Sequence, residues 1–168
     1  MDNKDTIILP GMPHLEWMTE NLSGFGGTEI DGRWYYTYDE AVEAVKKLGD
    51  GWRLPTRGEM VDLDDLGSTW DDDRKGRWFG GNHATDHEGS LFLEASRYRE
   101  RTSGALTSVG ARGLWWSSSP AASGSTYASD VNFYASYVYP MDSDNRAFGF
   151  AVRCVRNLQR ASASETNE

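Results

Sequence analysis

The strongest periodic pattern of apolar positions in the chain predicts a helix that ends at Gly49. Apolar residues between Ala41 and Leu48 recur at the three- and four-residue spacing that gathers side chains on one helix face. Thr37 or Asp39 can cap the N-terminus, because a side-chain oxygen there accepts a hydrogen bond from a backbone N–H of the first turn. Gly49 then ends the helix, as glycine commonly does.

A second helix is predicted shortly after the first. Thr56 stands three residues before Glu59, which is the spacing of a capping box. Met60, Leu63 and Leu66 follow at helical spacing. The early part of the chain therefore contains two predicted helices.

The C-terminal part changes to short strand-like segments separated by Ser, Gly, Asp and Asn. Val131 and Phe133 alternate with Asp130 and Asn132, so we expect one face of that strand on the core and the other in solvent. An earlier segment, GRWYYT, also has strand character. The late predicted strands are LWWSSS, YASDVNF, YVYP and FGFAVRCV.

Two helices early and strands late indicate the α+β class. Residues 67–113 have weak periodicity and predict no regular structure. We expect residues 1–14 to be an extended lead-in, residues 15–157 to form one domain, and residues 158–168 to be a polar tail.

Composition and charge exclude several classes of function. The chain has 168 residues, of which 38% are apolar, and it contains 7 Trp, 8 Tyr and 6 Phe, which suits a folded domain. Its net charge of −9 opposes binding to a nucleic-acid backbone. No run approaches the roughly 18 apolar residues of a membrane span, and the N-terminus lacks the pattern of a signal peptide. We expect no nucleic-acid partner and no membrane insertion.

Candidate metal and catalytic patterns are weak. His83 and His87 lie four apart, but neighbouring glycines make an aligning helix doubtful. The acidic segments 71–73 and 142–145 offer oxygen ligands suited to calcium, although a solvated acidic loop is the expected reading of each. Cys154 is the only cysteine, and no nucleophile elbow, phosphate-binding glycine loop or zincin motif is present. We expect no metal, no cofactor and no catalysis.

Five ordered blocks carry a family resemblance: EWMTENL, YYTYDEA, GWRLPTRGEMVDL, GLWWSSSP and RAFGFAVRCVRN. Together they resemble the major paralogous domain first noted in Fibrobacter, over about residues 15–157. That domain belongs to the C-type lectin-like superfamily, with the formylglycine-generating enzymes and the variable proteins of diversity-generating retroelements. The resemblance implies a C-type lectin-like fold with two helices, small twisted antiparallel sheets and long irregular loops. The paired active-site cysteines of the formylglycine-generating enzymes have no counterpart here.

The resemblance also implies a variable surface. In the retroelement proteins, substitution at adenines diversifies surface positions of the last strands and loops, and residues 121–148 correspond to that stretch. Between Ala121 and Asn145 only Met141 falls outside the residues that such diversified codons encode. Tyrosine offers a large rigid contact surface, while Ser, Asn and Asp offer adaptable hydrogen bonds. An ordinary Ser- and Tyr-rich loop has a similar composition, so this pattern leaves the assignment open.

The predicted function is a non-enzymatic module that binds a cell-surface protein or glycan, on a virion or bacterial cell surface, as in phage attachment to a bacterial host. The alternative is a structural or assembly decoration of a virion or envelope, and homo-oligomers fit either. Alternation about the apolar positions predicts Asp130, Asn132, Tyr134, Tyr137 and Tyr139 on the outward side, although each tyrosine can instead cover a thin core. The predicted ligand-binding residues are Ser123, Tyr127, Ser129, Asp130, Asn132, Tyr134, Ser136, Tyr137, Tyr139, Asp142, Asp144 and Phe148.

Other prominent residues are expected to be structural. Trp115 and Trp116 invite a sugar-stacking interpretation, but consecutive strand residues face opposite ways, and we expect core packing for both. Trp52 is expected in the core as well. Arg146 and Arg153 are expected to pair with carboxylates.

Overall fold

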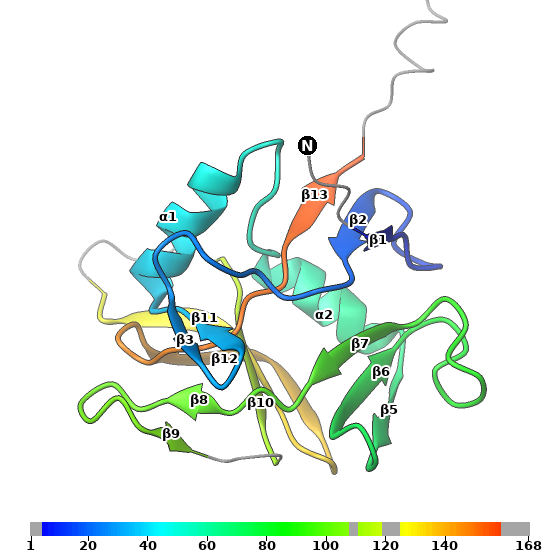
Figure 1. The fold of residues 1–168 in the computed structure, drawn as a ribbon. Coiled ribbons are helices and arrows are strands. Elements are labelled where there is room, and N and C mark those ends of the chain that lie inside the picture. The colour runs from blue at the N-terminus through cyan, green and yellow to red at the C-terminus, as the bar shows by residue number, and fades with distance from the viewer. Residues whose placement is uncertain (1–4, 108–110, 119–124, 159–168) are drawn as a thin grey trace, which may run out of the picture.

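The computed structural model describes residues 5–107, 111–118 and 125–158 (Figure 1). Over these residues the chain is an α+β protein with two helices and several small antiparallel sheets, none of them closed. The α+β class expected from the sequence is therefore confirmed. No helix in the described part of the chain is long and apolar enough to cross a membrane.

Helix α1 (Tyr38–Leu48) forms where the apolar periodicity predicts it. The Thr37 hydroxyl accepts a hydrogen bond from the Glu40 N–H at 3.2 Å, and the Glu40 carboxylate accepts one from the Thr37 N–H at 2.9 Å. This capping box satisfies two backbone donors that the first turn would leave free. Ala41 and Ala44 are buried on the inner face.

Helix α2 (Arg57–Asp65) begins with the same device. The Thr56 hydroxyl accepts from the Glu59 N–H at 3.0 Å, and the Glu59 carboxylate accepts from the Thr56 N–H at 2.8 Å. Met60 and Leu63 are buried on its inner face. Both predicted helices and the Thr56 capping box are confirmed.

The central sheet has the order β10-β11-β12 and is antiparallel throughout. Its strands are β10 (Gly113–Trp116), β11 (Tyr127–Phe133) and β12 (Val138–Asn145). Smaller sheets surround it in Figure 1. They are β1 (Thr6–Ile7) with β2 (Leu15–Met18) and β13 (Val155–Asn157), β3 (Thr28–Ile30) with β4 (Arg33–Tyr35), β5 (Ser68–Asp71) with β6 (Gly76–Phe79) and β7 (Leu91–Glu94), and β8 (Tyr98–Arg99) with β9 (Leu106–Thr107).

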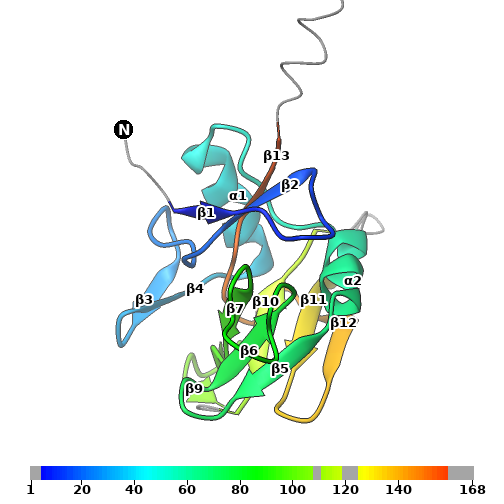
Figure 2. The ribbon, with the colours of Figure 1, turned by 90° about the vertical axis from the view of Figure 1, so that its right-hand side faces the viewer.

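Two core clusters cover the two faces of the central sheet. Trp115 and Trp116 are consecutive on β10, and both are fully buried. Trp116 packs in the cluster with Phe150 and the inner face of α1, whereas Trp115 packs in the cluster with Phe133 and the inner face of α2. Figure 2 shows α2 beside β11 and β12. The expected core packing of both tryptophans is confirmed, and so is that of Trp52.

The segment between residues 67 and 113, for which the sequence predicts no regular structure, contains five short strands. All four residues of β5 are half-buried, so the strand has no alternation between a buried and an exposed side. Its sequence accordingly lacks the alternating pattern that predicts a strand. The turn after it is held by the Asp71 carboxylate, which accepts hydrogen bonds from the N–H groups of Asp73 and Arg74 at 3.0 Å each. The acidic segment 71–73 thus belongs to the hairpin turn that joins β5 to β6. Both strands are too short to give a periodic pattern in the sequence.

Two further segments differ from the sequence-based expectation. FGFAVRCV, predicted as a strand, makes only isolated bridges at Gly149, Phe150 and Ala151 before β13 begins at Val155. The segment before residue 15 is more than a lead-in, because Leu9 is fully buried and Met12 belongs to the same core cluster. The polar tail, apart from residue 158, lies outside the described residues.

Gly113→Ala is expected to lower the free energy of unfolding by about 1–3 kcal/mol, because overpacking a core has costs of this order. A Cβ atom at this position would lie 2.3 Å from the Phe133 ring, which faces Gly113 across the β10–β11 ladder. Gly58→Ala is the matched control, since its Cβ would meet nothing closer than 3.9 Å. In a helix this change is neutral or raises stability by up to about 1 kcal/mol. Urea unfolding measures both, and equal effects would contradict the packing described.

Candidate binding face

β12 is an edge strand of the central sheet, and its register with β11 shifts between Asp130 and Asn132. Residues directly opposite each other in a ladder lie on the same side of a sheet. Asp142 lies opposite Asp130 in the ladder, and Tyr139 lies opposite Asn132. We call the following set the acid–tyrosine face: Arg112, Asp130, Asn132, Tyr134, Tyr137, Tyr139, Asp142 and Asp144.

Three tyrosines form a continuous stack at one end of this face. The ring centroids of Tyr134 and Tyr137 are 4.9 Å apart, and those of Tyr137 and Tyr139 are 4.7 Å apart. Tyr137 is 40% exposed and Tyr139 is 55% exposed, while Tyr134 is half-buried between strand and turn. The predicted outward placement of Tyr137 and Tyr139 is confirmed.

Backbone contacts hold the turn that carries the stack. The Tyr134 N–H donates to the Tyr137 carbonyl at 2.9 Å and so closes the turn between β11 and β12. Arg77 of β6 reaches across and donates from Nη1 to the carbonyls of Tyr134 and Ala135 at 2.9 and 3.0 Å. The tyrosines therefore stand on a fixed backbone.

Arg112 joins the tyrosines to the acidic part of the face. Its guanidinium carbon lies 5.1 Å from the Tyr134 ring centroid, and its Nε donates to the Asn132 side-chain oxygen at 3.1 Å. The Asn132 amide in turn donates to Asp142 at 3.2 Å. Arg112 also lies 5.6 Å from the Tyr98 ring, which packs edge-on against Phe148. One connected network thus links β8, β11, β12 and the residue before β10.

Several predicted site residues do not lie where strand alternation places them. Ser129, Asp130 and Asn132 are buried, with exposures of 2%, 0% and 4%, so their predicted surface positions are wrong. β11 is the middle strand and is covered on both faces, so after its first residue it has no face in solvent. Ser129, like Val131, is on the opposite side of the sheet from Asp130 by strand alternation.

The remaining predicted residues are dispersed. Tyr127 is 54% exposed, but alternation places it on the opposite side of the sheet from Asp130. Ser136 is exposed in the turn of the tyrosine stack, and Phe148 is half-buried against Tyr98. Ser123 lies outside the described residues.

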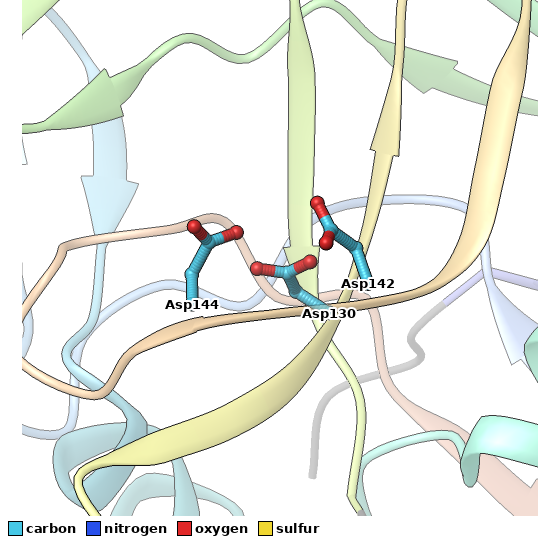
Figure 3. A group of neighbouring side chains, drawn as sticks. All are labelled: Asp130, Asp142 and Asp144. Carbon is cyan, nitrogen blue, oxygen red and sulfur yellow. The ribbon is translucent and has the colours of Figure 1, made fainter.

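The carboxyl groups of Asp130, Asp142 and Asp144 meet in the middle of the face, as Figure 3 shows. One oxygen from each lies within 4.8 Å of the others. Burial is the main cause that raises the pKa of Asp130, and the neighbouring carboxyl groups of Asp144 and Asp142 add to it. Together they raise this pKa to about 10, because desolvation and like charges both disfavour ionisation. Among the described residues, these three form the one group of His, Cys, Asp or Glu side chains whose ligand atoms lie close enough together to hold a metal ion.

The histidines do not form such a group. The His83 Nδ1 lies 2.8 Å from the Thr69 hydroxyl, whereas His87 stacks flat on Trp78 with centroids 4.2 Å apart. The two arginines singled out by sequence have different partners. Arg146 pairs with Asp39, and the buried Arg153 hydrogen-bonds Asn21 instead of a carboxylate.

Sequence reasoning did not find Arg77, Arg112 or Tyr98. Each is distant in sequence from residues 121–148 and reaches the face only through the folded backbone. No local pattern marks them, because a single arginine in a Gly- and Asp-rich segment has the composition of an ordinary solvated loop. Only the pairing of β6, β8 and β10 with their neighbours brings these side chains to the face.

Comparison of the chain with family models, with curated proteins and with solved structures gives no match. The geometry of the acid–tyrosine face is therefore what bears on function. It offers exposed rings for contact, a guanidinium behind them, and carboxylates beside them, all on strands and a clamped turn.

Asp130→Asn is expected to raise the free energy of unfolding at pH 7 in buffer that contains a chelator. The folded chain holds the Asp130 carboxyl protonated, with a pKa near 10 against 3.8 for the ordinary group. The folded state then binds a proton that the unfolded state releases, so stability falls as pH rises from about 4 to about 10. The neutral amide removes that dependence.

The measurement is urea unfolding at several pH values, with Asp73→Asn as the control. Asp73 is exposed in the β5–β6 turn, and its substitution makes the same chemical change away from the cluster. The control should keep the wild-type slope of stability against pH. An unchanged slope in Asp130→Asn would show that Asp130 is ionised in the folded protein.

Proposed function

We propose that the chain is a non-enzymatic binding module of C-type lectin-like fold that contacts a cell-surface protein or glycan through the acid–tyrosine face. The observation that carries this proposal is the exposed stack of Tyr137 and Tyr139 on a turn clamped by Arg77. These rings lie outside both core clusters, so the fold does not require them. Exposed aromatic side chains that are dispensable for the core favour a role in recognition.

The rigidity of the stack supports binding over simple surface coverage. Ordering a flexible side chain on association costs about 0.5–1.5 kcal/mol. The tyrosine rings already contact one another, and Arg112 lies over Tyr134, so much of that cost is met before a partner arrives. The nearby Asp142 and Asp144 offer hydrogen-bond acceptors to hydroxyl or amide groups of a partner.

We further propose a diversity-generating retroelement variable protein, for example a phage protein attached to the virion that adheres to a bacterial host. Within residues 121–148, the described residues differ in how freely they could vary. The exposed residues of β12 and of its preceding turn can change without altering the core, whereas β11 is buried from Ala128 to Phe133. Two helices with small antiparallel sheets support the lectin-like assignment.

Tyr137→Ala with Tyr139→Ala is expected to weaken partner binding at least tenfold and to leave the melting temperature nearly unchanged. The control is Tyr127→Ala, which removes an equally exposed ring from the opposite side of the sheet. The probes are the fluorescently labelled chain on a printed array of bacterial surface glycans and on a panel of intact bacterial strains. Protease or periodate treatment of the bound cells separates a protein partner from a glycan.

Two outcomes would contradict the proposal. One is equal loss of binding in the Tyr127→Ala control, which would remove the specificity of the face. The other is the absence of binding to every array spot and strain, which favours the structural or assembly module. A large fall in the melting temperature of the double variant would show that these rings support the core.

The retroelement assignment predicts an arrangement in the genome that encodes this chain. A near-copy of the segment for residues 121–155 should lie close to a reverse-transcriptase gene and differ from that segment at adenines. Sequencing of the locus tests this. Absence of both features would leave a fixed binding face and would remove the proposal of diversification.

A further inference from the structure

The geometry of the three central carboxyl groups fits one metal ion. Asp130, Asp142 and Asp144 each place an oxygen within 4.8 Å of the others (Figure 3). Calcium–oxygen distances are about 2.3–2.6 Å, so ligands on opposite sides of the ion lie about 5 Å apart. A single calcium ion between the carboxyl groups can therefore contact all three with little movement of the strands.

The burial of Asp130 is a separate observation that points to a ligand. Its side chain is fully buried, and neither of its oxygens accepts a hydrogen bond from any described residue. One oxygen of Asp144 is buried and also lacks a donor. A buried carboxylate without donors costs several kcal/mol unless a cation or proton compensates it. In Figure 3 the Asp130 carboxyl group points into the space between the other two.

Protein cations do not meet this need. The ion pairs among the described residues involve none of the three carboxylates. The nearby Arg112 donates to Asn132, and Asp142 accepts from the Asn132 amide and from the Ser143 backbone N–H, which are both neutral donors. The carboxyl groups of Asp130, Asp142 and Asp144 therefore lie together, and no lysine or arginine among the described residues is bonded to them.

The chemistry of the donors selects the kind of ion. Three carboxylates supply up to six hard oxygen ligands and no nitrogen or sulfur, which suits calcium better than zinc. Magnesium requires a smaller, near-octahedral shell and keeps several waters. Asp142 and Asp144 are half-buried and open the cluster to solvent, so an ion can enter.

We propose that Asp130, Asp142 and Asp144 bind a calcium ion at the edge of the central sheet. The ion ties β11 to β12 within the acid–tyrosine face, where the two strands pair through Asp130 and Asp142. This site does not depend on the proposed binding of a cell-surface partner.

The test is calorimetric titration of the full chain with CaCl₂ after the chain has been stripped with a chelator and desalted. We expect one saturable site and a higher melting temperature in calcium than in chelator. Asp130→Asn and Asp144→Asn should each weaken calcium binding at least tenfold. Asp73→Asn, which removes the same charge from an exposed turn, should bind calcium like the wild type.

Each other outcome overturns the proposal. A wild-type chain with no saturable site would show that the cluster is compensated by protons alone. Equal weakening in the Asp73→Asn control would show that calcium acts by general screening of the −9 charge. A magnesium affinity equal to that for calcium would contradict the assigned ion. Circular dichroism in chelator verifies that each variant is folded, and Asp144→Asn gives a second result should Asp130→Asn fail to fold.

Discussion

Burial of the central sheet on both faces is the constraint on which the rest of this structure depends. Trp115 and Trp116 are neighbours on β10, and a strand directs neighbouring side chains to opposite faces. Both can be fully buried only because α1 and its cluster cover one face and α2 with its cluster covers the other. The middle strand β11 consequently has no solvent face from Ala128 to Phe133, and its polar residues there are shielded from water.

The same constraint gives β11 and β12 different roles. β11 carries Asp130 and Asn132 into the interior, whereas β12, as an edge strand, displays its side chains. A long exposed edge can recruit other strands and aggregate. β12 carries Pro140 and alternating acidic residues, and its register with β11 shifts between Asp130 and Asn132. Proline, charged residues and bulges on an edge strand disfavour its pairing with strands of other molecules. The exposed edge of β12 therefore need not cause aggregation.

Local signals explain which elements the sequence could predict. Both helices were predictable because capping boxes and apolar spacing lie within a dozen residues of each other. The bounds of β11 match the segment YASDVNF, since turn residues delimit it. Its exposure was not predictable, because burial of Asp130 depends on partners at β10 and β12. The weak signal of β5 reflects a strand that is half-buried along its whole length.

The site shows the same division. The displayed tyrosines follow from local composition, but Arg112 and Arg77 enter from distant segments. The hydrogen bonds that Arg77 donates to the turn go to the backbone carbonyl oxygens of Tyr134 and Ala135. Every amino acid has a backbone carbonyl oxygen, so these hydrogen bonds do not depend on which side chains the turn carries. Substitution of the turn side chains therefore leaves the two acceptors of Arg77 in place.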